Sequence, residues 1–165
     1  MFGSYANSLD ECVDCRRPRG CTQGCASESA RPLEGAWELV EAKQTPPDPT
    51  FTFADCRQIK ILTKTHWAYL SQKRAPPKLT SQTNDAELLA AAKAFGAGGG
   101  TYTLEGDTFT ERIEFFSAPN YVELSLPWKI RWEGDEWIQT GTFPMKSLGL
   151  ADHDVELYER YRRIK

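Results

Sequence analysis

Three polar side chains in this sequence stand among apolar neighbours, at positions where a strand would turn them inward. Glu111 lies between Phe109 and Ile113 at alternate positions, and His66 and Tyr102 also share a predicted strand face with apolar residues. Carboxyl, imidazole and phenol groups within about 3 Å of a substrate proton can act as general acids and bases, and burial can tune their pKa values. His66, Tyr102 and Glu111 are therefore the candidate catalytic residues if the protein is an isomerase, a cyclase or a hydrolase.

A wider set of polar and aromatic residues lies on the apolar faces of the predicted strands and would line the interior of a closed sheet. An ionised carboxylate among apolar side chains needs a partner, because its burial alone is costly and shifts its pKa. We therefore expect Glu111 or Glu159 to pair with Arg163, or with Lys60 if that side chain turns inward. The residues predicted to line the interior are Trp37, His66, Tyr102, Glu111, Leu124, Trp128, Gln139, Glu159 and Arg163.

Four cysteines near the N-terminus form two closely spaced pairs, Cys12 with Cys15 and Cys21 with Cys25. The spacing within each pair suits zinc, but the gap between the pairs is much shorter than in the familiar zinc modules. We therefore favour a flexible, cysteine-rich tail over residues 1–31 with incidental thiols, and keep zinc or disulfides as alternatives. Cys56 is expected to be a small buried residue rather than a nucleophile. The sequence predicts no bound metal and no cofactor.

The longest alternating stretch of the chain indicates the kind of fold that would position these residues. A period of two predicts a β-strand with one face in an apolar interior, and two tryptophans on that face indicate a large interior, as in a barrel. The residues of the predicted inner face are Val122, Leu124, Leu126, Trp128, Ile130 and Trp132.

Turn signals divide residues 32–165 into short strands joined mostly as hairpins. One helix is predicted over residues 85–95, capped by Asn84 and ended by Gly96. The glycines at 98–100 precede a strand rather than a helix, so they do not form a phosphate-binding loop. The pattern predicts an all-β fold, an up-and-down antiparallel barrel of about eight strands with one inserted helix. The predicted strands are 34–43, 58–63, 65–71, 101–105, 108–116, 122–132, 136–143 and 153–164.

The segment Gly35-Ala36-Trp37 resembles the Gly-x-Trp motif of the lipocalin and calycin barrels. In those families a basic residue of the last strand packs over the tryptophan and closes one end of the barrel, a place that Arg163 or Arg160 could take. The segments QIKILTKTHWAYL, GGGTYTLEGDTFTERIEFF, GDEWIQTG and LYERYRRIK are similar to poorly characterised bacterial lipocalin-like domain proteins. The resemblance covers residues 32–165 and implies an eight-stranded barrel that holds a small apolar ligand.

Composition and charge argue against several other classes of protein. The formal net charge of -3 gives no basic surface for nucleic acid, and no apolar run has the length of a membrane span. Residues 1–31 lack the apolar segment of an export signal, so we expect a cytoplasmic protein, with export still open. The oligomeric state stays undetermined.

We expect a barrel that binds a small hydrophobic or amphipathic molecule. One alternative is an enzyme that uses the acid and base residues inside the same barrel. Another is a carrier of haem or a similar group, with His66 as the axial ligand.

Overall fold

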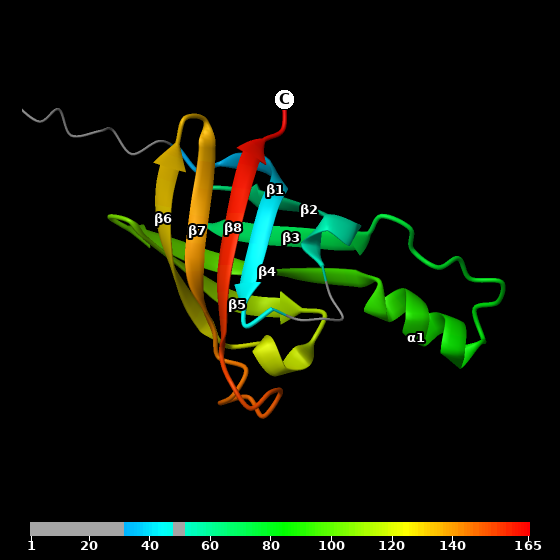
Figure 1. The fold of residues 1–165 in the computed structure, drawn as a ribbon. Coiled ribbons are helices and arrows are strands. Elements are labelled where there is room, and N and C mark those ends of the chain that lie inside the picture. The colour runs from blue at the N-terminus through cyan, green and yellow to red at the C-terminus, as the bar shows by residue number, and fades with distance from the viewer. Residues whose placement is uncertain (1–31, 48–51) are drawn as a thin grey trace, which may run out of the picture. The chain divides into compact units, whose positions relative to one another are not determined.

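The computed structural model describes residues 32–47 and 52–165, so the predictions for Cys12, Cys15, Cys21 and Cys25 concern residues outside the described part. Eight antiparallel strands close into a barrel in chain order, and the last strand pairs with the first (Figure 1). This confirms the predicted all-β, up-and-down fold. The strands are β1 (Gly35–Thr45), β2 (Cys56–Leu62), β3 (His66–Lys73), β4 (Phe95–Glu105), β5 (Thr108–Phe116), β6 (Ser125–Glu133), β7 (Glu136–Phe143) and β8 (Val155–Arg163).

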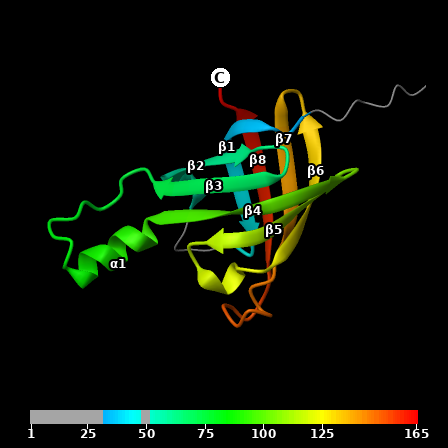
Figure 2. The ribbon, with the colours of Figure 1, turned by 180° about the vertical axis from the view of Figure 1, so that it is seen from behind.

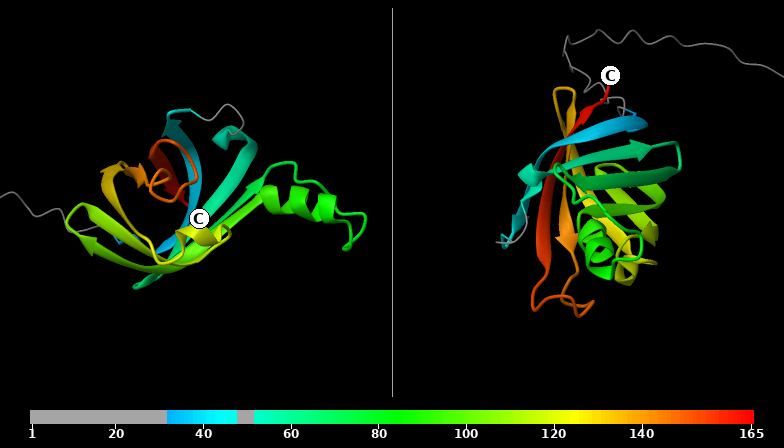
Figure 3. Two further views of the ribbon diagram at one scale, coloured as in Figure 1. Left: turned by 90° about the horizontal axis from the view of Figure 1, so that it is seen from below. Right: turned by 90° about the vertical axis from the view of Figure 1, so that its right-hand side faces the viewer.

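A single α-helix within the described residues, α1 (Asp85–Lys93), projects from the side of the ring of strands (Figures 2 and 3). The Asn84 side chain caps it by accepting from the backbone N–H groups of Ala86 and Glu87, as predicted. The helix ends at Lys93, before the predicted boundary, because the following residues already belong to β4 and pair with β3. None of the helix residues is buried. No helix among the described residues is long and apolar enough to cross a membrane.

The predicted strand 122–132 is shorter in the structure, because its first residues form a turn. A 3₁₀ turn at Pro119–Tyr121 and a positive φ of 72° at Glu123 delay the start of β6 until Ser125. Val122, predicted to lie on the inner face, is therefore partly exposed, whereas Tyr121 in the turn is buried. The remainder of the alternation holds: Trp128 is inside and only 2% exposed.

Strands β2 and β3 carry much of their apolar surface on the outside of the barrel. Lys60 points inward and is 3% exposed, whereas its neighbour Ile61 is 42% exposed. In β3, Trp67 is buried inside and Leu70 lies outside, 45% exposed. The face of β3 that contains both His66 and Leu70 is thus the outer face, whereas we had expected the face of His66 to be the inner one.

One end of the barrel is closed by the Gly-x-Trp segment and the last strand. The Arg163 guanidinium lies 4.2 Å from the centre of the Trp37 ring and donates hydrogen bonds to the backbone oxygens of Glu34 and Pro32. Gly35 has a φ of +135°, and a Cβ there would overlap that guanidinium. The motif therefore needs glycine both for its backbone conformation and for the space that Arg163 occupies.

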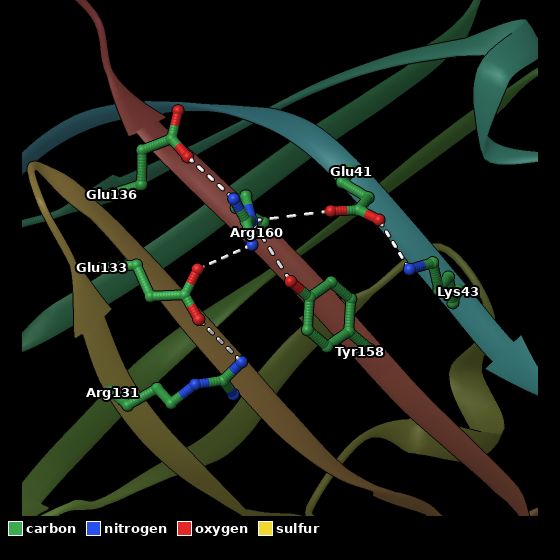
Figure 4. A network of polar contacts seen from close by, with 7 residues as sticks. All are labelled: Glu41, Lys43, Arg131, Glu133, Glu136, Tyr158 and Arg160. Atoms are coloured by element: carbon green, nitrogen blue, oxygen red, sulfur yellow. Dashed lines mark hydrogen bonds and ion pairs between the residues drawn. The ribbon is translucent and has the colours of Figure 1, made fainter.

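The alternative residue for this position, Arg160, lies on the outer face of β8 (Figure 4). Its guanidinium forms ion pairs with Glu133 at 2.7 Å, Glu136 at 3.4 Å and Glu41 at 3.5 Å. These partners belong to β1, β6 and β7, so the network joins neighbouring strands on the outside. Such partly exposed pairs contribute little stability individually.

Candidate functional site

A cavity of about 150 Å³ lies inside the barrel. Its wall combines aromatic rings with a group of buried polar side chains, the usual composition of a small-molecule site. The lining residues are Gln58, Lys60, Trp67, Tyr69, Glu111, Ile113, Phe116, Leu126, Trp128, Gln139, Phe143, Leu157, Glu159 and Tyr161.

The aromatic wall next to β4 depends on the absence of a side chain in that strand. A Cβ at Gly98 would lie 2.7 Å from the rings of both Tyr69 and Phe116. These two rings, whose centres are 5.5 Å apart, occupy the space that a β4 side chain would otherwise fill.

A chain of buried hydrogen bonds crosses the cavity from β2 to β8. Lys60 Nζ donates to Glu111 Oε1 at 2.8 Å and to Gln139 Oε1 at 3.1 Å. Gln139 Nε2 donates in turn to Glu159 Oε2 at 2.5 Å. All four residues are at least nine-tenths buried, so the polar groups satisfy one another away from bulk water.

Further donors bond to both carboxylates of this network. Trp128 Nε1 donates to Glu111 Oε2 at 2.9 Å, so both oxygens of Glu111 have donors. The Tyr161 hydroxyl donates to Glu159 Oε2 at 2.9 Å and accepts from Gln58 Nε2 at 2.8 Å. These bonds also fix the orientation of the Tyr161 and Trp128 rings in the cavity wall.

Burial governs the electrostatics of the cavity. It raises the pKa of Glu111, and the Lys60 ammonium opposes this rise. Burial, reinforced by Glu159, also raises the pKa values of Tyr69 and Tyr161, so that both phenols are neutral at pH 7.

The Lys60 ammonium lies among aromatic ring faces as well as beside its carboxylate partner. Ring centres between 5.1 and 6.0 Å from Nζ provide a favourable electrostatic environment for the cation. The five rings are those of Trp67, Phe109, Trp128, Trp137 and Tyr161.

An outer pocket of about 240 Å³ adjoins the cavity and shares Gln58 and Tyr69 with it. Its other walls include Cys56, Lys73 and Lys93. Cys56 is buried at the start of β2, and burial raises the pKa of its thiol, which disfavours a nucleophilic role. The two lysines are exposed to water.

The structure brings four of the predicted lining residues together around the cavity: Glu111, Trp128, Gln139 and Glu159. Trp37 and Arg163 belong instead to the closed end, and Leu124 lies in the turn before β6. Glu111 pairs with Lys60, whose side chain turns inward, and not with Arg163, the first partner that we expected; Arg163 donates to backbone oxygens instead.

The other two candidate catalytic residues do not reach the cavity, contrary to our expectation that they would converge there with Glu111. His66 is exposed on the outer face of β3 and contacts the Thr65 hydroxyl at 2.8 Å. Tyr102 is opposite Glu111 in the sheet, but its hydroxyl donates to the backbone oxygen of Thr63, away from the cavity lining. The alternation of a strand predicts on which side of the sheet a side chain lies, but it does not predict how far along the barrel axis the side chain lies from the cavity.

Several cavity residues were not identified from the sequence, among them Gln58, Trp67, Tyr69 and Tyr161. Trp67 and Tyr69 alternate in a short strand whose other face is also apolar, so their inward direction was ambiguous. A preference for placing the largest rings inside would have identified them.

Compared with models of known protein families, with curated proteins and with solved structures, the chain shows no significant match to any of them. The architecture is compatible with a calycin-like barrel. Among the described residues no three His, Cys, Asp or Glu side chains are grouped closely enough to hold a metal ion. The observations that bear on function are therefore those of the barrel and its cavity.

Proposed function

We propose that this protein is a lipocalin-like barrel that binds one small hydrophobic or amphipathic molecule in its interior. The observation that carries the proposal is the cavity, which has aromatic walls and a buried polar group at one side. Its volume of about 150 Å³ is that of an apolar cavity that accepts benzene. The ligand is therefore small, and its polar end contacts the buried network.

The lipocalin-like part of the proposal is supported by the closed end of the barrel. The stacking of Arg163 on Trp37 matches what the Gly-x-Trp resemblance implies for the last strand. The requirement for glycine at position 35 is consistent with the same motif.

Catalysis in the same cavity is the weaker alternative. Of the three candidate acid and base residues only Glu111 lines the cavity, and both its oxygens already accept hydrogen bonds from the protein. The alternative of a haem carrier is not supported, because His66, its candidate axial ligand, does not line the cavity.

Binding can be tested with the purified full-length chain and a small aromatic alcohol. Native mass spectrometry would detect a retained molecule, and titration with benzyl alcohol would report through the fluorescence of Trp67 and Trp128 in the cavity wall. We expect saturable binding of one molecule per chain. Leu157→Trp, which fills the cavity, should abolish binding, whereas Leu150→Trp at an exposed position should not. Unsaturable binding, or binding unaffected by Leu157→Trp, would contradict the proposal.

A further inference from the structure

The hydrogen bonds around Glu159 have a fixed direction. Lys60 can only donate, so the Gln139 oxygen faces it and the Gln139 amide group must donate to Glu159. Tyr161 accepts from Gln58 and gives its only proton to the same oxygen of Glu159, Oε2. Two donors, Gln139 and Tyr161, thus meet on one oxygen of Glu159.

Two glutamates and one lysine line the cavity, so the lining has one acidic group more than its own basic group can pair with. Lys60 forms its ion pair with Glu111, and none of the ion pairs among residues 32–47 and 52–165 includes Glu159. Glu159 is only 8% exposed, and within this part of the chain nothing donates to its second oxygen, Oε1. Because Glu159 lines the cavity, this oxygen is available to accept a hydrogen bond from a molecule bound there.

The surroundings of Glu159 suit a positively charged donor. The rings of Trp67, Trp128 and Tyr161 line the same cavity. Aromatic faces attract ammonium groups in addition to burying hydrocarbon. The network already contains one ammonium in such surroundings, that of Lys60.

We propose that the ligand of this cavity is a small amine, whose protonated nitrogen donates to Oε1 of Glu159 and whose hydrocarbon part packs against the aromatic wall. The volume accommodates a hydrocarbon part of about one six-membered ring. This inference rests on the proposed binding function and specifies the chemical class of its ligand.

The outer pocket would favour a negatively charged ligand, whereas the cavity favours a positively charged one. Lys73 and Lys93 line the outer pocket and would attract an anionic group. Both are exposed, so water and salt weaken their attraction, whereas Glu159 acts from a buried position. A ligand that enters the cavity should follow the charge of Glu159.

Three probes of nearly equal size and different charge separate these preferences: benzylamine, benzyl alcohol and benzoate. Isothermal titration calorimetry of the full-length chain at pH 7 should show benzylamine binding at least about tenfold more tightly than benzyl alcohol. Benzoate should bind most weakly of the three.

The matched variants lie on the same strand. Glu159→Gln keeps an oxygen to accept from Gln139 and Tyr161 but removes the charge, so the preference for benzylamine should fall to within about threefold. Glu156→Gln, on the exposed outer face and bonded to the Thr142 hydroxyl, should keep the full preference. Circular dichroism establishes that each variant is folded.

The outcomes distinguish this inference from the proposed function. If benzyl alcohol or benzoate binds the unaltered protein as tightly as benzylamine, the amine inference is wrong although the barrel still binds ligands. A benzylamine preference that survives in folded Glu159→Gln also overturns it. Failure of all three probes to bind overturns both proposals. The comparison among probes in the unaltered protein is decisive even if Glu159→Gln does not fold.

Discussion

Replacing Lys60 with methionine tests how much the buried ion pair contributes to the stability of the barrel. Methionine retains a long apolar side chain but removes the ammonium that bonds to Glu111 at 2.8 Å and to Gln139 at 3.1 Å. Both members of the ion pair are less than 5% exposed. Removing one member of such a pair leaves an uncompensated buried charge and typically costs about 3–5 kcal/mol.

A second lysine provides the matched control for this change. Lys129 forms an ion pair of nearly the same length with Asp107, 2.9 Å, but both side chains are about two-thirds exposed. Lys129→Met should therefore leave the free energy of unfolding almost unchanged, because water screens that pair. Urea unfolding followed by tryptophan fluorescence measures both variants.

The double variant Lys60→Met/Glu111→Leu separates the cost of an isolated charge from the contribution of the pair. With both charges replaced, the loss should be smaller than the sum of the two single losses by about 2 kcal/mol or more. Additive losses, or a loss below about 1 kcal/mol for Lys60→Met alone, would refute the view that Lys60 and Glu111 act as one buried unit.

Three further changes test other parts of the interior. Trp128→Phe should cost about 1–3 kcal/mol more than Trp137→Phe in urea unfolding, because Trp128 donates to Glu111 whereas the Trp137 indole nitrogen has no partner among the described residues. Because burial raises the folded-state pKa of Glu111, the folded protein binds a proton more tightly than the unfolded chain, and stability falls as pH rises through that pKa. Unfolding free energies measured from pH 4 upward should accordingly decline relative to Glu111→Gln; a parallel pH profile would contradict the assignment. Phe115→Ala should cost less than about 1 kcal/mol, since Phe115 is 72% exposed, whereas Phe116→Ala in the cavity wall should cost about 2–4 kcal/mol; equal losses would count against the assigned faces.

The sequence allowed the inner faces of most of β5 to β8 to be predicted, because these strands place most of their large apolar residues on one side. Glu111, Trp128, Gln139 and Glu159 were identified there by their position among such residues. Alternation is informative where the two faces differ strongly in polarity.

Alternation alone did not predict the inner face of β3 or of the end of β5. Both faces of β3 are partly apolar, so His66 was assigned to the wrong side together with Leu70. In β5, a bulge at Glu114 changes the phase of the alternation, so that Phe115 faces outward and Phe116 takes the inner position. A bulge depends on pairing with β4 and has no signal in the strand's own sequence.

The inverted polarity of β2 has a consequence for how the sheet is aligned. Sliding β2 by one residue against its neighbours would bring Ile59 and Ile61 inside and release Gln58 and Lys60 to water. Each face of β2 carries two apolar residues, Cys56 and Leu62 on the inner face and Ile59 and Ile61 on the outer face, so its hydrophobic pattern alone does not distinguish the two registers. The native alignment is secured by contacts from the inner polar residues to distant strands, Lys60 to Glu111 and Gln58 to Tyr161. The polar interior therefore selects between two alignments of the same sequence, and the side chains that equip the cavity for a ligand also specify the barrel that contains it.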